Sequence, residues 1–264
     1  MRLNISVSTN IGMLRKNNED FFYANGKHLT DGIADDFSAS YTEEITDSAV
    51  YAVCDGMGGE SCGEVASAAA VKVLGRYRDL ITGAENPVER KETVNAYAKA
   101  ATDEINREVA EAGGIRGGTT LTLACIRDSI ISMYYLGDSR IYMYRGGVLT
   151  RLTRDHTVAA DMIDSNVLTE EEAERSPDRH KLTMYLGVDD DCDEIKAGFA
   201  GSYTLTEGDM FLMCTDGLNE MCTSEEISEL LAENGENPAS VLVDRALENG
   251  GRDNVTCLVI RVVK

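Results

Sequence analysis

The chain has 264 residues and a formal net charge of −21 at pH 7, which argues against nucleic acid or an anionic membrane as its main partner, because both need basic surface. Its seven cysteines form no CxxC pair, a usage typical of reduced thiols in a cytoplasmic protein rather than of a disulfide framework. Without a signal peptide, a long apolar stretch or a linker of biased composition, we expect one compact domain over residues 1–264 and no membrane segment.

Short strands and an acidic turn open the chain. Residues 3–9 alternate apolar and polar and predict a first strand, and residues 21–23 predict a second. Between them, Arg15 precedes the pair Glu19-Asp20. Such a pair is usually a solvated turn; its functional interpretation is two oxygen ligands beside a guanidinium suited to phosphate. We expect the polar, acidic residues 25–48 to form a surface excursion.

Three apolar runs have an aspartate at one end. Asp55-Gly56 ends the run that starts at Val50, Asp216-Gly217 ends the run that starts at Met210, and Asp253-Asn254 precedes the final run. Any one of these aspartates is most often part of a turn. If the three converge, they form a cluster of hard oxygen ligands whose repulsion only cations relieve, so Mg²⁺ or Mn²⁺ is expected and zinc is a poor fit. Asp138 marks a fourth acidic strand end.

The periodicity of the apolar residues predicts the remaining elements. Helices are expected over residues 60–80, from Pro87 to Gly113, over 227–234 and over 238–249. Strands are expected over 121–126, 130–136, 141–144 and 148–152 as an antiparallel meander, and over 195–205, 210–215 and 255–263. An early and a late helix pair around sheet predict an α+β fold: a four-layer α-β-β-α sandwich of two mainly antiparallel sheets flanked by helix pairs.

A polar, weakly patterned segment, residues 157–181, lies between the strands. A capping box at Thr169 predicts one short helix over 170–175. We expect the segment to be a mobile flap near a site. His156 and His180 could act as acid–base groups because histidine titrates near neutrality, although a histidine without a placed partner is more often structural.

Six short motifs together resemble those of a known family. In chain order they are Arg15…Asn18-Glu19-Asp20, Asp55-Gly56-Met57-Gly58-Gly59, Gly118-Thr119-Thr120, Gly137-Asp138-Ser139-Arg140, Asp216-Gly217 and Asp253-Asn254. With them the chain resembles the bacterial form of the protein phosphatase 2C family, the metal-dependent protein serine/threonine phosphatases. The resemblance covers essentially the whole chain, and the order of the motifs makes it specific. The fold of that family, a β-sandwich flanked by helix pairs, agrees with the elements above.

The resemblance implies a site and a reaction. Two Mg²⁺ or Mn²⁺ ions would be bridged by Asp55, with the Gly56 carbonyl, Asp216 and Asp253 completing their ligands and Glu19 and Asp20 beside the second ion. Arg15 would bind the substrate phosphate, and Asp138 would serve a third metal. A water shared by the two ions would attack the phosphorus of phosphoserine or phosphothreonine directly. The expected enzyme is a monomer that reverses the action of a bacterial serine/threonine kinase on phosphoproteins.

Two departures from the family leave questions open. Met57 stands where eukaryotic members have a histidine, and methionine cannot donate a proton; a metal-bound water or His156 are alternatives for the leaving-group acid. Met184 stands where many bacterial members have arginine, a difference that we expect to alter how the flap contacts substrate.

Three other classes of function compete with the phosphatase. A non-catalytic binding module is disfavoured because no metal aspartate is lost. A thiolate phosphatase is disfavoured because none of the cysteines has an arginine six positions on. A hydrolase of small phosphoesters would share the chemistry and differ in the flap.

Overall fold

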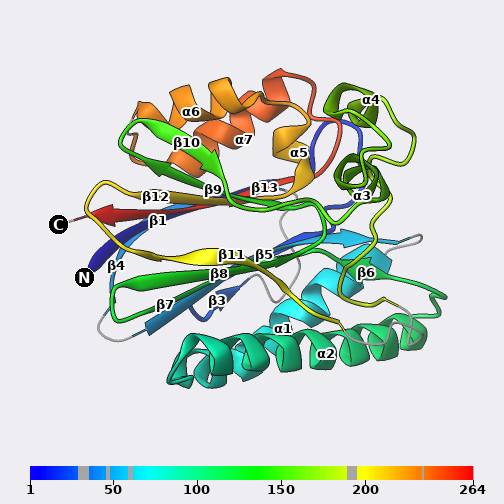
Figure 1. Ribbon diagram of the computed structural model, residues 1–264, viewed down its shortest axis with the longest axis horizontal. Helices are drawn as coiled ribbons and strands as arrows, with labels where there is room; N and C mark the ends of the chain where they lie inside the picture. Colours follow the sequence, from blue (N-terminus) through cyan, green and yellow to red (C-terminus); the bar gives the residue numbers. More distant parts are fainter. Residues whose placement is uncertain (29–35, 46–47, 59–61, 189–194, 234, 264) are drawn as a thin grey trace.

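A computed structural model describes residues 1–28, 36–45, 48–58, 62–188, 195–233 and 235–263. Two β-sheets lie face to face in these residues, and helices cover both outer surfaces (Figure 1). Neighbouring strands within both sheets run antiparallel. None of the helices in these residues is long and apolar enough to cross a membrane.

The strands divide between the two sheets without following chain order. The first sheet contains β1 (Arg2–Asn10), β4 (Asp36–Glu44), β9 (Arg140–Arg145), β10 (Val148–Arg151), β12 (Met210–Cys214) and β13 (Val255–Val263), in the order β10-β9-β12-β13-β1-β4. The second contains β2 (Asp20–Ala24), β3 (Lys27–His28), β5 (Ser48–Met57), β7 (Leu121–Arg127), β8 (Ile130–Leu136) and β11 (Gly198–Thr204), in the order β11-β8-β7-β5-β2-β3. The short β6 (Gly118–Thr119) pairs with the end of β5.

Helix pairs cover the two outer faces. The helices α1 (Cys62–Gly83) and α2 (Pro87–Glu111) lie on the second sheet, and α6 (Ser224–Ala232) and α7 (Pro238–Glu248) lie on the first (Figure 1). Asn86 accepts the backbone N–H groups of Val88 and Glu89, which fixes the start of α2. A capping box between Thr223 and Glu226 fixes the start of α6.

Three clusters of buried apolar side chains lie between the four layers of helices and sheets. Tyr51 and Phe211 lie in the layer between the sheets, Tyr97 in the layer under α1 and α2, and Leu242 in the layer under α7, all fully buried. Burial of such side chains stabilises each interface by about 1.5–3 kcal/mol per residue. The predicted α+β sandwich is therefore confirmed.

The surface excursion expected over residues 25–48 is wrong for the part of it that the structure describes. Residues 36–44 form β4, which pairs with β1 along its whole length, and residues 27–28 form β3. β4 is an edge strand: Phe37, Ala39 and Tyr41 pack against the core between the sheets while the alternate residues are polar. The polar and acidic residues on its outer face gave the segment the composition of a loop. Residues 29–35 and 46–47 lie outside the described residues.

The four-stranded meander expected over 121–152 is divided between the sheets. β7 pairs with β8 in the second sheet, and β9 pairs with β10 in the first. The chain therefore crosses from one sheet to the other at residues 137–139, where Gly137 has φ +96° and a Cβ would meet Thr120 at 2.6 Å. Asp138 therefore lies in the connection between the two sheets, and not in a hairpin turn within one sheet.

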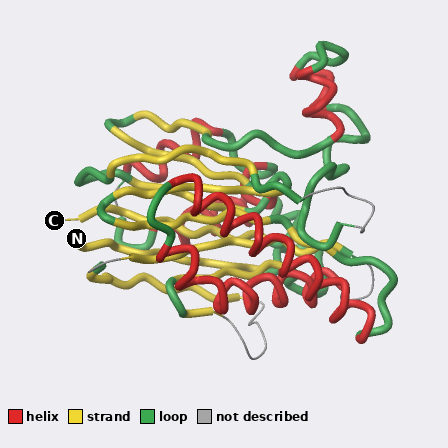
Figure 2. Tube along the Cα trace, turned by 60° about the horizontal axis from the view of Figure 1, so that its bottom comes forward, coloured by secondary structure: helices red, strands yellow, loops and turns green. Residues whose placement is uncertain are grey.

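The segment 157–181 projects from one end of the sandwich (Figure 2). It contains the expected short helix as α4 (Glu170–Glu174) and a second helix, α3 (Val158–Asp164), that the sequence pattern did not indicate. Thr157 caps α3 by accepting the N–H of Ala160. A further short helix, α5 (Asp216–Asn219), follows β12 directly. The expected mobility of the flap stays a prediction.

Candidate metal centre

Carboxylates from distant parts of the chain meet in one cavity. They line a cavity of about 450 Å³. The lining residues are Arg15, Glu19, Asp55, Gly56, Met57, Gly58, Thr120, Asp138, His180, Leu182, Asp216, Glu220 and Asp253. The convergence of the aspartate-bearing strand ends that the sequence suggested is therefore present. Gly59, part of the same motif, lies outside the described residues.

The pairing of β2 with β5 places two of the carboxylates side by side. Asp20 lies directly opposite Asp55 in the antiparallel ladder. The Gly56 N–H donates to the Glu19 carbonyl at 3.1 Å. A Cβ on Gly56 would meet the Gly63 carbonyl oxygen at 2.2 Å and the Glu19 carbonyl oxygen at 2.5 Å, so glycine is the residue that lets these three backbones approach.

Two buried hydroxyl groups connect Asp55 with the crossing that carries Asp138. The Asp55 N–H donates to Thr120 Oγ1 at 3.0 Å, and Thr120 Oγ1 lies 2.6 Å from Ser139 Oγ. Thr120 and Ser139 are at most 2% exposed. The motif residues Thr120 and Ser139 thus join the ends of strands from both sheets and fix two of the acidic residues relative to each other.

Asn254 holds the loop before β2 against the start of β13. Its Oδ1 accepts the Glu19 N–H at 2.8 Å, and its Nδ2 donates to the carbonyls of Ile11 at 2.8 Å and Asn17 at 2.9 Å. Asn254 is 5% exposed, so these backbone groups have little access to water. The side chain therefore positions the loop that carries Arg15 and Glu19.

Crowding of carboxylates in this buried site disfavours their charged forms. Burial, together with the charges of Asp20 and Asp216, raises the pKa of Asp55 well above its usual range. Burial raises the pKa of Asp20 to about 7, against the opposing effect of hydrogen bonds from threonine hydroxyls. Burial and the neighbouring Asp155 raise the pKa of Asp138 to about 7. The site stores electrostatic repulsion that bound cations would remove.

The donor atoms fit hard divalent cations. They are carboxylate oxygens and the Gly56 carbonyl, the ligands that Mg²⁺ and Mn²⁺ prefer. The Asp20 Oδ2 accepts the Thr215 hydroxyl at 2.9 Å, but its buried Oδ1 has no hydrogen-bond partner in the described part of the chain. A buried carboxylate oxygen without a partner is costly, and a cation or a water held by one would satisfy it.

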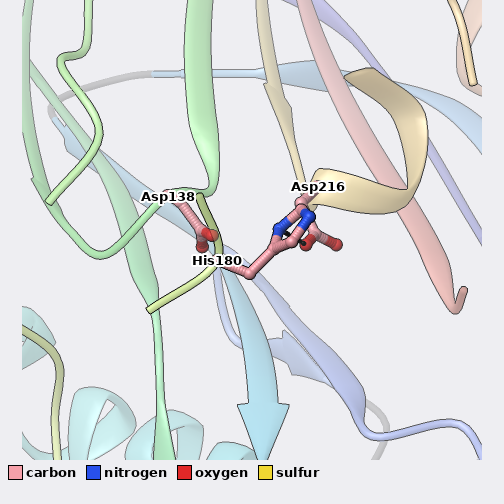
Figure 3. A group of neighbouring side chains, drawn as sticks. All are labelled: Asp138, His180 and Asp216. Atoms are coloured by element: carbon pink, nitrogen blue, oxygen red, sulfur yellow. Dashed lines mark ion pairs between the residues drawn. The ribbon is translucent and has the colours of Figure 1, made fainter. Parts of the chain in front are cut away.

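A second group of possible ligands lies at the flap side of the cavity. Ligand atoms of Asp138, His180 and Asp216 all lie within 4.8 Å of one another. Figure 3 shows the His180 ring directed toward Asp216, with Asp138 on the other side. His180 Nδ1 is 3.8 Å from Asp216 Oδ2, and its Nε2 is 2.9 Å from Glu220 Oε1. The flap therefore contacts the acidic cavity through a histidine.

The two candidate histidines differ in placement. His156 does not line the cavity: its ring stacks on Tyr135 with centroids 4.9 Å apart, and its Nδ1 accepts the Gly137 N–H at 3.2 Å. Burial lowers the pKa of His156, which disfavours its proton-donating form. This geometry gives His156 a structural role at the crossing between the sheets, whereas His180 reaches the cavity.

The other sequence-predicted residues lie as follows. Arg15 lies at the cavity and pairs with Asp253, and Asp20 adjoins the cavity without lining it. Glu220 was not anticipated, although it stands four residues after Asp216. That spacing places both residues on one helix face, but the sequence pattern did not indicate α5.

Comparisons with known proteins agree with this arrangement. The family model described as protein phosphatase 2C matches residues 26–248. The serine/threonine protein phosphatase PstP of Mycobacterium tuberculosis is 31% identical over 99% of this chain and 45% of its own length, so the chain spans about half of that relative. Protein phosphatase PhpP of Streptococcus pneumoniae is 29% identical over 98% of this chain and 97% of its own.

Solved structures share the whole fold. A serine/threonine phosphatase of S. agalactiae has a TM-score of 0.84 at 26% identity, covering 98% of this chain and 99% of that one. The catalytic domain of PstP in complex with two manganese ions has a TM-score of 0.76 at 28% identity, covering both chains completely. With the family model matching most of its length, this chain belongs to the protein phosphatase 2C family.

Proposed function

We propose that this protein is a Mn²⁺- or Mg²⁺-dependent phosphatase that hydrolyses phosphoserine and phosphothreonine in proteins. The observation that carries the proposal is the convergence of Asp55, Asp216 and Asp253 with Glu19 in one cavity beside an arginine. Family membership and the names of the relatives, which are serine/threonine phosphatases, support the same reaction.

The proposed ligands follow from the geometry. Asp55, the Gly56 carbonyl, Asp216 and Asp253 would hold two cations, with Glu19 and Asp20 beside them, and Asp138 with His180 would serve a weaker third site. When bound, such cations lower the pKa of water and offset the negative charge that develops on a phosphoryl group. Thr120 and Asn254 would keep the acidic residues in place for this chemistry through the hydrogen bonds described above.

Arg15 would bind the phosphate. Its guanidinium is half exposed and pairs with Asp253, a proposed ligand. A cation held by Asp253 would compete for that carboxylate, and the planar fork of Arg15 could then engage a phosphate with two hydrogen bonds. Met57 lines the cavity and cannot protonate the leaving group. His180 is the better-placed histidine for that step, and His156, considered from the sequence, is not.

We further propose that residues 1–264 act as one catalytic domain, as a monomer, in the cytoplasm, on the substrates of a serine/threonine kinase. The six cysteines that the structure describes are all buried and free, which suits a reducing compartment.

The test is phosphate release from a phosphothreonine peptide with Mn²⁺ and with excess chelator. The proposal predicts that turnover requires Mn²⁺ and falls at least a hundredfold in Asp216→Asn. Turnover should persist in the control variant Asp244→Asn, because Asp244 is an exposed aspartate on α7. Activity that survives chelation contradicts the proposal. Greater catalytic efficiency on nucleotides than on phosphopeptides would identify a hydrolase of small phosphoesters instead.

A further inference from the structure

A buried network of polar side chains surrounds Asp20, behind the metal centre. Strands of both sheets contribute to it: Thr9 lies on β1, Asn18 in the loop before β2, Asp20 on β2, Thr215 directly after β12 and Thr256 on β13. All five residues are at most 3% exposed. Polar groups buried this deeply must form hydrogen bonds with one another, because bulk water does not reach them.

Two threonine hydroxyls bind the Asp20 carboxylate. Thr215 donates to its Oδ2 at 2.9 Å, and the Thr256 hydroxyl also forms a hydrogen bond with the carboxylate. The backbone holds the two threonines together: the Thr215 N–H donates to the Thr256 carbonyl at 3.1 Å, and the Thr256 N–H donates to Thr215 Oγ1 at 2.9 Å. Because Thr215 Oγ1 accepts that N–H group, its own proton is available to Asp20.

The remaining hydrogen bonds direct the Thr256 proton toward Asp20 as well. Asn18 Oδ1 accepts the Asp20 N–H at 3.1 Å, so the Asn18 amide nitrogen faces Thr9 and donates to its Oγ1 at 2.8 Å. An amide nitrogen can only donate. Thr9 Oγ1 lies 2.7 Å from Thr256 Oγ1, the remaining partner for the Thr9 proton among the described residues. Thr256 therefore accepts from Thr9, and its own proton is left for the carboxylate.

The network leaves one carboxylate oxygen for another ligand. Asp20 Oδ1 is buried and has no hydrogen-bond partner among the described residues. Asp20 lies opposite Asp55, a proposed metal ligand, in the ladder between β2 and β5. Fixed donors restrict the rotation of the carboxylate, so it presents Oδ1 in one position before any cation binds. A ligand that is already oriented loses little conformational entropy on binding.

We propose that Thr215 and Thr256, supported by Thr9, are positioning residues of the metal centre: they orient the Asp20 carboxylate so that its Oδ1 meets a divalent cation or a water held by that cation. The inference rests on the proposed metal-dependent function and adds residues that contact neither the substrate nor the cation. Hydrogen-bond partners of metal ligands typically contribute about 10- to 100-fold to metal affinity.

The experiment is a calorimetric titration of the chelator-treated protein with Mn²⁺, for the wild type and for Thr256→Val. Valine has the branched shape of threonine and lacks the hydroxyl. We expect at least one Mn²⁺ ion to bind about tenfold more weakly to this variant. Thr256→Ser, which keeps the hydroxyl, should bind Mn²⁺ like the wild type. Thr9→Val should weaken Mn²⁺ binding by less, because Thr9 acts on Asp20 only through Thr256.

Ser132→Ala is the matched control. Ser132 is 1% exposed on β8, its hydroxyl lies 2.8 Å from the Ser202 hydroxyl, and it does not line the cavity. Like Thr256→Val, the substitution removes one buried hydroxyl from a pair of hydroxyls, so urea unfolding in chelator should show a loss of about 1 kcal/mol in stability. Mn²⁺ binding should be unchanged. The control thus separates a loss of stability from a loss of metal affinity.

Wild-type Mn²⁺ affinity in Thr256→Val would overturn the positioning role and leave the phosphatase intact. The same conclusion would follow if Ser132→Ala or Thr256→Ser weakened Mn²⁺ binding as much as Thr256→Val does. Should Thr256→Val fail to fold, wild-type affinity in Thr9→Val would overturn the role instead. A folded wild-type protein that binds no Mn²⁺ would overturn the proposed function, and the positioning role with it.

Discussion

Replacing Asn254 by alanine tests whether one buried amide positions the catalytic loop. The substitution removes three hydrogen bonds to the backbone of Glu19, Ile11 and Asn17. At about 1 kcal/mol each, these bonds contribute about 3 kcal/mol to the free energy of unfolding. We expect a loss of that size, and because Arg15 and Glu19 lie on the released loop, we also expect weaker Mn²⁺ binding and a lower kcat/KM.

The assay pairs urea unfolding in chelator with calorimetric titration of Mn²⁺. Asn249→Ala is the control: Asn249 also donates its side-chain amide to a backbone carbonyl, that of Met221 at 2.8 Å, but it is exposed and does not line the cavity. It should cost less than about 1 kcal/mol and leave Mn²⁺ binding unchanged. If Asn254→Ala loses stability yet binds Mn²⁺ like the wild type, the loop is not positioned in this way.

Two further predictions concern the close backbone contact at Gly56 and the buried carboxylates Asp20 and Asp138. Gly56→Ala should prevent Mn²⁺ binding and lower the thermal midpoint, because its Cβ would overlap the Gly63 carbonyl; a stable, Mn²⁺-binding variant would contradict this. Burial raises the pKa values of Asp20 and Asp138 to about 7, above about 4 in the unfolded chain. Their contribution to stability is therefore complete below about pH 4 and is lost as the pH rises through 7. In chelator the thermal midpoint should fall between pH 5 and pH 8, and saturating Mn²⁺ should abolish the fall; equal slopes with and without Mn²⁺ would refute the reasoning.

Local patterns were sufficient to single out the aspartates that line the cavity. Two apolar runs end at Asp55 and Asp216, and a third begins after Asp253, so each aspartate stands next to its strand in the sequence. Strands buried on both faces are recognisable because they are continuous apolar runs. Their convergence was a condition that the sequence left open, and the structure meets it by placing all three aspartates around one cavity. The long helices α1, α2, α6 and α7 were predictable for the same reason, since their apolar stripes are local, whereas the short helices α3 and α5 were not.

Features that depend on distant partners were not predictable from the pattern. β4 is a strand because β1 offers it a partner, and its polar alternation alone looked like a loop. β8 and β9 are neighbours in sequence but belong to different sheets, a choice made by packing between the layers. The roles of Thr120 and Asn254 likewise depend on contacts across more than sixty residues of chain, which no local periodicity records.

The most direct test of the central claim is a calorimetric titration of the chelator-treated protein with Mn²⁺, compared with the same titration of Asp216→Asn. We predict that the wild type binds two Mn²⁺ ions through the carboxylates of the cavity, and that the variant binds them at least tenfold more weakly. A folded wild-type protein that takes up no Mn²⁺ would contradict the account and point to a binding module without catalysis.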